Sequence, residues 1–148
     1  MTVLAYRDGI LAADRLGLRC GTKSTANKIH RVHDGWMAGA GSTASVLEMV
    51  NWYRAGANPK DLPSRQRTEE NDVLMLMNKQ GVFVFERGPY PIPLAQPWLA
   101  LGSGAEYATT ALYLGKSARE AVEITSQLCS TCGNGVDWVT LGMHEPEH

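Results

Sequence analysis

The 148-residue sequence has few cysteines, no long apolar run and no cluster of basic residues. Three cysteines, an odd number, favour a reducing compartment over a disulfide framework. No apolar run approaches the ~18 residues of a membrane span, and the first residues lack the pattern of a signal peptide. The 14 basic and 15 acidic residues leave a net charge of −1, which makes nucleic acid an unexpected partner. We therefore expect a cytoplasmic protein with no membrane or nucleic-acid partner.

The composition is that of an ordinary globular protein, with 44% apolar and 20% charged residues. A chain of this length fits one domain and buries about 68–70% of its unfolded surface, which is enough for a real core. We expect a single domain over residues 1–148, with residues 142–148 as a tail.

The first fourteen residues predict a β-hairpin. Residues 2–6 and 10–13 are short apolar runs, and Asp8 and Gly9 between them form the strongest short hairpin signal. Such a hairpin brings Asp14 back beside Thr2. If Met1 is removed, Thr2 becomes a hydroxyl nucleophile that carries its own base, the free α-amine.

The rest of the chain alternates groups of strands with helices. Residues 16–22 are expected to form a loop, 57–71 a polar connector, and the proline-rich residues 88–93 an irregular crossing. Further strands are expected at 23–32, 36–41, 73–77, 82–85, 98–101 and 136–141, and helices at 42–56, 105–115 and 117–128. Grouped strands with amphipathic helices outside them predict a layered α+β sandwich.

Four segments, in this order and spacing, resemble the proteasome β-type subunits, including HslV, within the N-terminal-nucleophile (Ntn) hydrolases. These segments are Thr2 with the sequence GILAAD at 9–14, NKIHRV at 27–32, MAGAGSTA at 37–44 and LGSGAEYA at 101–108. The resemblance runs from Thr2 to about Leu141. It implies a four-layer αββα sandwich and a threonine endopeptidase.

The resemblance also implies a role for each of five residues. Thr2 would attack the peptide carbonyl, with its own amine as the base. Lys28, in the strand after the first hairpin, would favour the neutral amine, and Asp14 would hold Lys28 in place. The backbone N–H of Gly41 would face the developing oxyanion, and Ser103 would support the amine and its proton path.

Ligands and partners follow from the same resemblance. Ala40 and Thr43 would line the substrate pocket. No cofactor is required, although backbone carbonyls of Ser126, Cys129 and Cys132 would hold a monovalent cation. The substrate would be an unfolded polypeptide or peptide, cut inside homo-oligomeric stacked rings that an ATP-dependent unfoldase serves.

Two alternatives stay open. In the first, the same fold is a catalytically silent structural or regulatory ring subunit, because Met1 is retained or because Cys129 and Cys132 replace the Asp and Ser that many β-type subunits carry. In the second, the spacing of Cys129, Cys132, His144 and His148 nearly matches a zinc finger and indicates a zinc-binding module. The order of the expected helix and strand opposes this second alternative.

Overall fold

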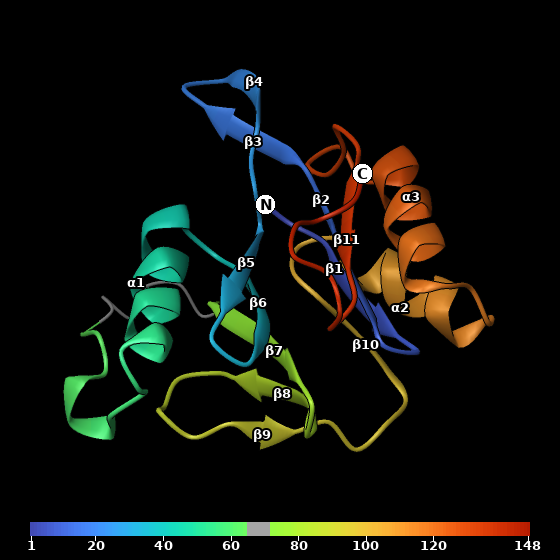
Figure 1. The fold of residues 1–148 in the computed structure, drawn as a ribbon. Helices are drawn as coiled ribbons and strands as arrows, with labels where there is room; N and C mark the ends of the chain where they lie inside the picture. Colours follow the sequence, from blue (N-terminus) through green and yellow to red (C-terminus); the bar gives the residue numbers. More distant parts are fainter. Residues whose placement is uncertain (65–71) are drawn as a thin grey trace.

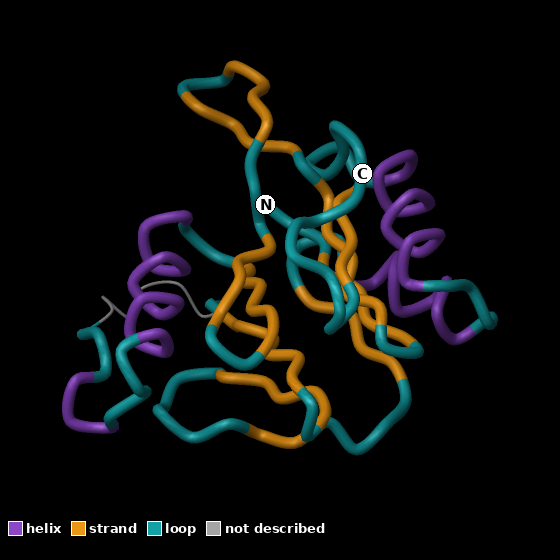
Figure 2. The backbone as a smooth tube through the Cα atoms, in the orientation of Figure 1, coloured by secondary structure: helices purple, strands orange, loops and turns teal. Residues whose placement is uncertain are grey.

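Two antiparallel β-sheets pack face to face in the computed structural model, which describes residues 1–64 and 72–148 (Figures 1 and 2). The first sheet has the order β10 (Trp98–Leu101), β1 (Leu4–Arg7), β2 (Ile10–Asp14) and β11 (Val136–Val139). The second sheet has the order β5 (Ile29–Val32), β6 (Gly35–Ala40), β7 (Val73–Asn78), β8 (Gly81–Phe85) and β9 (Ile92–Pro93).

Helices cover the outer face of each sheet. Helices α2 (Ala105–Tyr113) and α3 (Ala118–Leu128) lie against the first sheet, and α1 (Thr43–Arg54) lies against the second (Figure 1). Side chains alternate along each strand, so in β1 Leu4 enters the core between the sheets, whereas Ala5 faces α2 and α3. The predicted four-layer αββα sandwich is confirmed.

Several local signals form the structures they predict. Asp8 and Gly9 have φ angles of 52° and 79°, as a tight primed turn between β1 and β2 requires. Ser42 accepts a hydrogen bond from the backbone of Ser45 at the start of α1. Ser117 and Glu120 form the capping box that begins α3.

The expectation of a loop at residues 16–22 is wrong. Strands β3 (Leu16–Arg19) and β4 (Thr22–Thr25) form a hairpin that stands away from both sheets (Figure 1). Its turn uses Cys20 and Gly21, with φ angles of 51° and 79°. Most of its side chains are exposed, and β4, with the sequence TKST, contains no apolar residue. The apolar alternation is limited to Leu16 and Leu18 of β3, which is too short to indicate a hairpin. Lys28 consequently lies just before β5 and not within a strand.

Two other segments, at residues 88–93 and 142–148, are more ordered than the sequence suggests, and the connector contains one helical turn. A 3₁₀ turn, η1 (Pro59–Asp61), lies in the connector, whose residues 65–71 fall outside the described part of the chain. β9 brings Pro93 to the sheet edge, where a missing donor is tolerated. The expected tail folds back, with Glu147 pairing against Trp138. Within residues 1–64 and 72–148, every helix is too short or too polar to cross a membrane.

Candidate active site

Thr2 lies at the entrance to β1, held by the loop between β10 and α2. Its backbone N–H donates to Ser103 Oγ at 3.0 Å, while the Ser103 hydroxyl and the Gly104 N–H donate to the Thr2 carbonyl at 3.3 and 3.2 Å. Gly102 has a φ of 103°, and a Cβ there would lie 2.2 Å from that carbonyl oxygen. The close approach of this loop therefore needs a glycine, and it brings Ser103 to the Thr2 nitrogen.

Asp14 is completely buried and connects three segments of the chain. Its Oδ1 accepts the Val3 N–H at 3.0 Å and the Lys28 ammonium at 2.8 Å. Its Oδ2 accepts N–H groups from Gly133 at 3.0 Å and Leu16 at 3.4 Å. Donors at both oxygens satisfy the buried carboxylate and make it a fixed anchor for Lys28.

Lys28 places a positive charge beside the Thr2 nitrogen. Its side chain is 9% exposed, and its Nζ also donates to the Met1 carbonyl at 2.8 Å. That carbonyl oxygen is two bonds from the Thr2 nitrogen, so the ammonium lies no more than about 5.4 Å from this nitrogen. A cation at such a distance favours the neutral form of a free amine.

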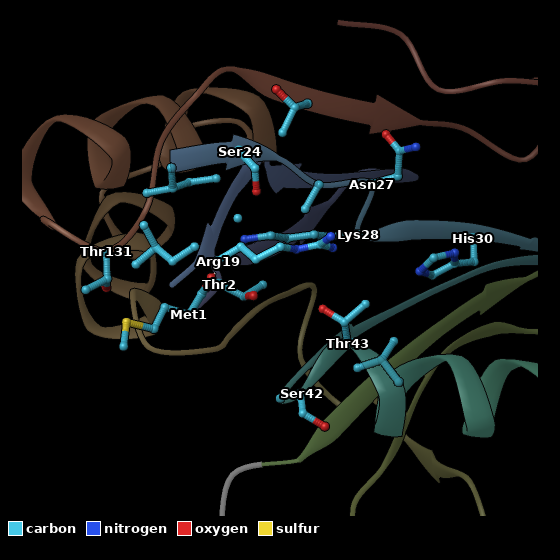
Figure 3. Close-up of a pocket in the computed structure, with 18 residues that line it drawn as sticks. Met1, Thr2, Arg19, Ser24, Asn27, Lys28, His30, Ser42, Thr43 and Thr131 are labelled. Atoms are coloured by element: carbon cyan, nitrogen blue, oxygen red, sulfur yellow. Dashed lines mark hydrogen bonds between the residues drawn. The ribbon is translucent and has the colours of Figure 1, made fainter. Parts of the chain in front are cut away.

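A cavity of about 510 Å³ opens in front of Thr2 (Figure 3). Thr2, Lys28, Gly41 and Thr43 line it, so the structure brings four of the expected site residues to one space. Ala40 is not among them. Side chains alternate along β6, so Ala40 enters the core between the sheets, while its neighbour Gly39 lines the cavity.

Gly41 connects β6 to the N-terminus of α1. Its φ is 142°, and a Cβ there would lie 1.8 Å from Asp72 Oδ1, so the position requires glycine. Because Ser42 is the N-cap of α1, Gly41 lies where the helix dipole favours negative charge. This wall of the cavity suits a developing oxyanion.

Cys129 is the C-cap of α3, and Cys132 lies in the turn that follows the helix. The Cys132 side chain is buried in the core under α2 and α3, and burial raises the pKa of its thiol to about 12. Cys129 ends α3, and its carbonyl accepts the Cys132 N–H at 3.3 Å. Ser126 lies within α3, where its hydroxyl donates to Val122. One of the three carbonyls expected to hold a cation thus already has a protein donor, and the cation stays a prediction.

The four residues of the zinc-finger spacing are dispersed. His148 contacts Asp137, and His144 lies 3.0 Å from Arg31. In the part of the chain that the structure describes, no three His, Cys, Asp or Glu side chains are grouped to hold a metal ion. The structure therefore gives no support to the zinc-binding alternative.

Sequence reasoning missed several residues of the site. Gly133 donates to Asp14 from 119 positions away, and no local signal indicates such a contact. Arg19 and Ser24, from the unexpected β3–β4 hairpin, and Thr131 also line the cavity (Figure 3). His30 lines it too, and burial, followed by the nearby Arg54, lowers its pKa.

Comparison with known proteins supports the fold. No family model matches the chain, and no curated protein sequence matches it. Among solved structures, Thiobacillus denitrificans BPH in complex with Epoxomicin is 21% identical, with a TM-score of 0.68 over 96% of this chain and 99% of that one. Eukaryotic HslV from Trypanosoma brucei is also 21% identical, with a TM-score of 0.63 over 93% and 97%. The resemblance to HslV is confirmed for the fold.

Proposed function

We propose that the chain is a threonine endopeptidase of a proteasome-like particle, with Thr2 as its N-terminal nucleophile after Met1 is removed. The observation that carries the proposal is the Thr2 nitrogen itself. Ser103 Oγ holds it at 3.0 Å, and the Lys28–Asp14 ion pair lies beside it on the wall of a cavity. A free amine at this point has both a polar partner and a cation that favours its neutral, basic form.

In the proposed reaction, the neutral Thr2 amine takes the proton from the Thr2 hydroxyl as its oxygen attacks a peptide carbonyl. The amine then passes the proton to the departing nitrogen, leaving an acyl-enzyme that water hydrolyses with the same amine as base. Gly41 supplies an N–H to the oxyanion, a contact that contributes about 2.7–4 kcal/mol in preorganised sites. Ser103 orients the amine during both proton transfers.

The resemblance extends the proposal to the assembly. We infer stacked homo-oligomeric rings that enclose the Thr2 sites, receive unfolded polypeptides or peptides, and work in the cytoplasm with an ATP-dependent unfoldase. The support is the likeness in fold to HslV over nearly the whole of both chains. A monovalent cation at the carbonyls of Ser126, Cys129 and Cys132 belongs to the same inference, and the reaction above uses no step through it.

The test is intact mass spectrometry before and after incubation with an epoxyketone, an electrophile directed at N-terminal threonine. The compound suits this fold because the similar BPH structure is a complex with Epoxomicin. We expect loss of Met1 and one adduct per chain. Met1 is 66% exposed, so an aminopeptidase can reach it.

Matched variants make the result specific. Thr2→Ala must abolish the adduct, whereas Thr43→Ala removes a threonine hydroxyl from the same cavity but leaves the nucleophile. An adduct that survives in Thr2→Ala, or a processed wild type without any adduct, would contradict the proposal. Cleavage of a fluorogenic peptide by the wild type and not by Thr2→Ala would extend the result from labelling to turnover.

The second candidate is the catalytically silent ring subunit, and one contact favours it. Lys28 Nζ donates to the carbonyl of Met1, so the site accommodates the unprocessed chain, in which the Thr2 nitrogen is an amide and not a base. Retention of Met1 in the purified protein, with no epoxyketone adduct, would support this candidate.

A further inference from the structure

Cys129 and Cys132 form a C-x-x-C pair closed by a turn. The Cys132 N–H donates to the Cys129 carbonyl at 3.3 Å, and the α-carbons of such a four-residue turn lie less than about 7 Å apart. Disulfides span about 4.4–6.8 Å between α-carbons. Both residues are free cysteines, and each thiol influences the pKa of the other. The pair can therefore close a disulfide without a large movement of the backbone.

The two thiols have different chemistry. Cys129 is partly exposed, and its Sγ lies 3.2 Å from Thr131 Oγ1, a contact that lowers the pKa of the thiol. Cys132 is 5% exposed, and burial keeps its thiol protonated. An accessible thiol that ionises readily beside a buried one is the arrangement of an attacking and a resolving cysteine.

The pair is also connected to the Thr2 site. Thr131, between the two cysteines, lines the cavity, and the Cys132 thiol contacts the Ser103 hydroxyl. The next residue, Gly133, donates to Asp14 Oδ2 at 3.0 Å. A change in the Cys129–Cys132 bond would therefore act on both Ser103 and Asp14, which position the Thr2 nitrogen and Lys28.

We propose that Cys129 and Cys132 are a reversible thiol–disulfide pair that low-molecular-weight disulfides oxidise, and that this oxidation slows the chemistry of Thr2. The Cys129 thiolate attacks one sulfur of the small disulfide and expels a thiolate. Cys132 then loses its proton to solvent and attacks Cys129 Sγ, which forms the internal bond and expels the second thiolate. The cysteines lose two electrons, and the small disulfide gains them as it becomes two thiols, which take up the two released protons.

The test equilibrates the full chain with glutathione disulfide, blocks the remaining thiols with N-ethylmaleimide in guanidinium chloride, so that the buried Cys132 is also reached, and digests with trypsin. Residues 120–148 contain both cysteines and no Lys or Arg, whereas Cys20 lies in the separate peptide 20–23. We expect peptide 120–148 to lose both labels and two hydrogens, and to regain both labels after dithiothreitol. If this peptide keeps both labels while Cys20 becomes glutathionylated, the pair is not oxidisable and the proposal is overturned.

Variants distinguish the attacking cysteine from the resolving cysteine. Cys132→Ser should stop at a stable glutathione adduct on Cys129, and Cys129→Ser should leave Cys132 as a labelled thiol. Thr131→Val should slow oxidation several-fold, whereas Thr131→Ser, which keeps the hydroxyl, should not. The reverse assignment, with an adduct on Cys132 in Cys129→Ser, would overturn the proposed order of attack.

The effect on Thr2 rests on the proposed function and has its own readout. Oxidised protein should form the epoxyketone adduct several-fold more slowly than reduced protein. Cys129→Ser, which cannot form the internal bond, should react at the same rate after glutathione disulfide as after dithiothreitol. Equal rates in the oxidised and reduced wild type would overturn the coupling to Thr2. Failure of both forms to give any adduct would refute the proposed function, while the thiol count would still decide whether the pair forms a disulfide.

Discussion

The buried ion pair of Asp14 and Lys28 allows a quantitative test by double-mutant cycle. Asp14→Asn removes the negative charge from a completely buried site and leaves the Lys28 ammonium, 9% exposed, without its counter-ion. Breaking a buried ion pair in this way lowers the free energy of unfolding by about 3–5 kcal/mol. Lys28→Met should lower the free energy of unfolding by about 3 kcal/mol, the lower end of that range, because three backbone N–H groups still donate to the Asp14 carboxylate.

The double variant should cost less than the two single variants together, because it leaves neither charge buried alone. We expect a coupling of about 2–3 kcal/mol in the free energy of unfolding, measured by urea denaturation followed by circular dichroism. Lys79→Met, at an exposed lysine, is the control and should change stability by less than about 0.5 kcal/mol. Single effects that add to within about 0.5 kcal/mol would refute the anchoring role of Asp14.

Three further predictions concern the surroundings of the site. Burial lowers the pKa of His30 below 6.5, so the imidazole is protonated more readily in the unfolded chain than in the folded one. Neutral His30 therefore costs no stability above about pH 6.5, and the free energy of unfolding decreases as the pH falls below that value. His30→Gln should therefore lose less stability than the wild type between about pH 7.5 and about pH 5 in urea titrations. Gly102→Ala should both destabilise the fold and slow epoxyketone labelling, because the new Cβ would meet the Thr2 carbonyl at 2.2 Å; unchanged labelling would contradict the close approach. Ser117→Ala should lower the free energy of unfolding by about 1 kcal/mol through loss of the capping box with Glu120, and a change indistinguishable from zero would show that the box contributes nothing.

Local signals predicted most of the elements around the site. Asp8 and Gly9 determine their turn through positive φ angles, and the capping box at Ser117 begins its helix whatever packs against it. The β3–β4 hairpin could not be predicted in this way. Its side chains are mostly exposed, and the apolar alternation in the hairpin is limited to Leu16 and Leu18, which is too short to indicate two strands.

The site itself depends on contacts between distant segments. The resemblance to proteasome β-type subunits indicated Thr2, Asp14, Lys28 and Ser103, and the structure brings all four together. The same resemblance implied that Ala40 lines the pocket, whereas the alternation of side chains along β6 directs Ala40 into the core between the sheets. Pocket membership depends on which face of a strand meets open space, and only the packing of two sheets determines that.

The sequence by itself determined the first hairpin, the caps of α1 and α3, and the alternation of strand groups with helices, because these depend on backbone preferences within a few residues. Only the tertiary structure decided that Gly133 donates to Asp14, that the Cys132 thiol interacts with Ser103, and that residues of the β3–β4 hairpin line the cavity. These contacts join segments up to 119 residues apart. They form because burying both faces of the first sheet brings the end of α3 against the start of the chain, and no local pattern encodes that meeting.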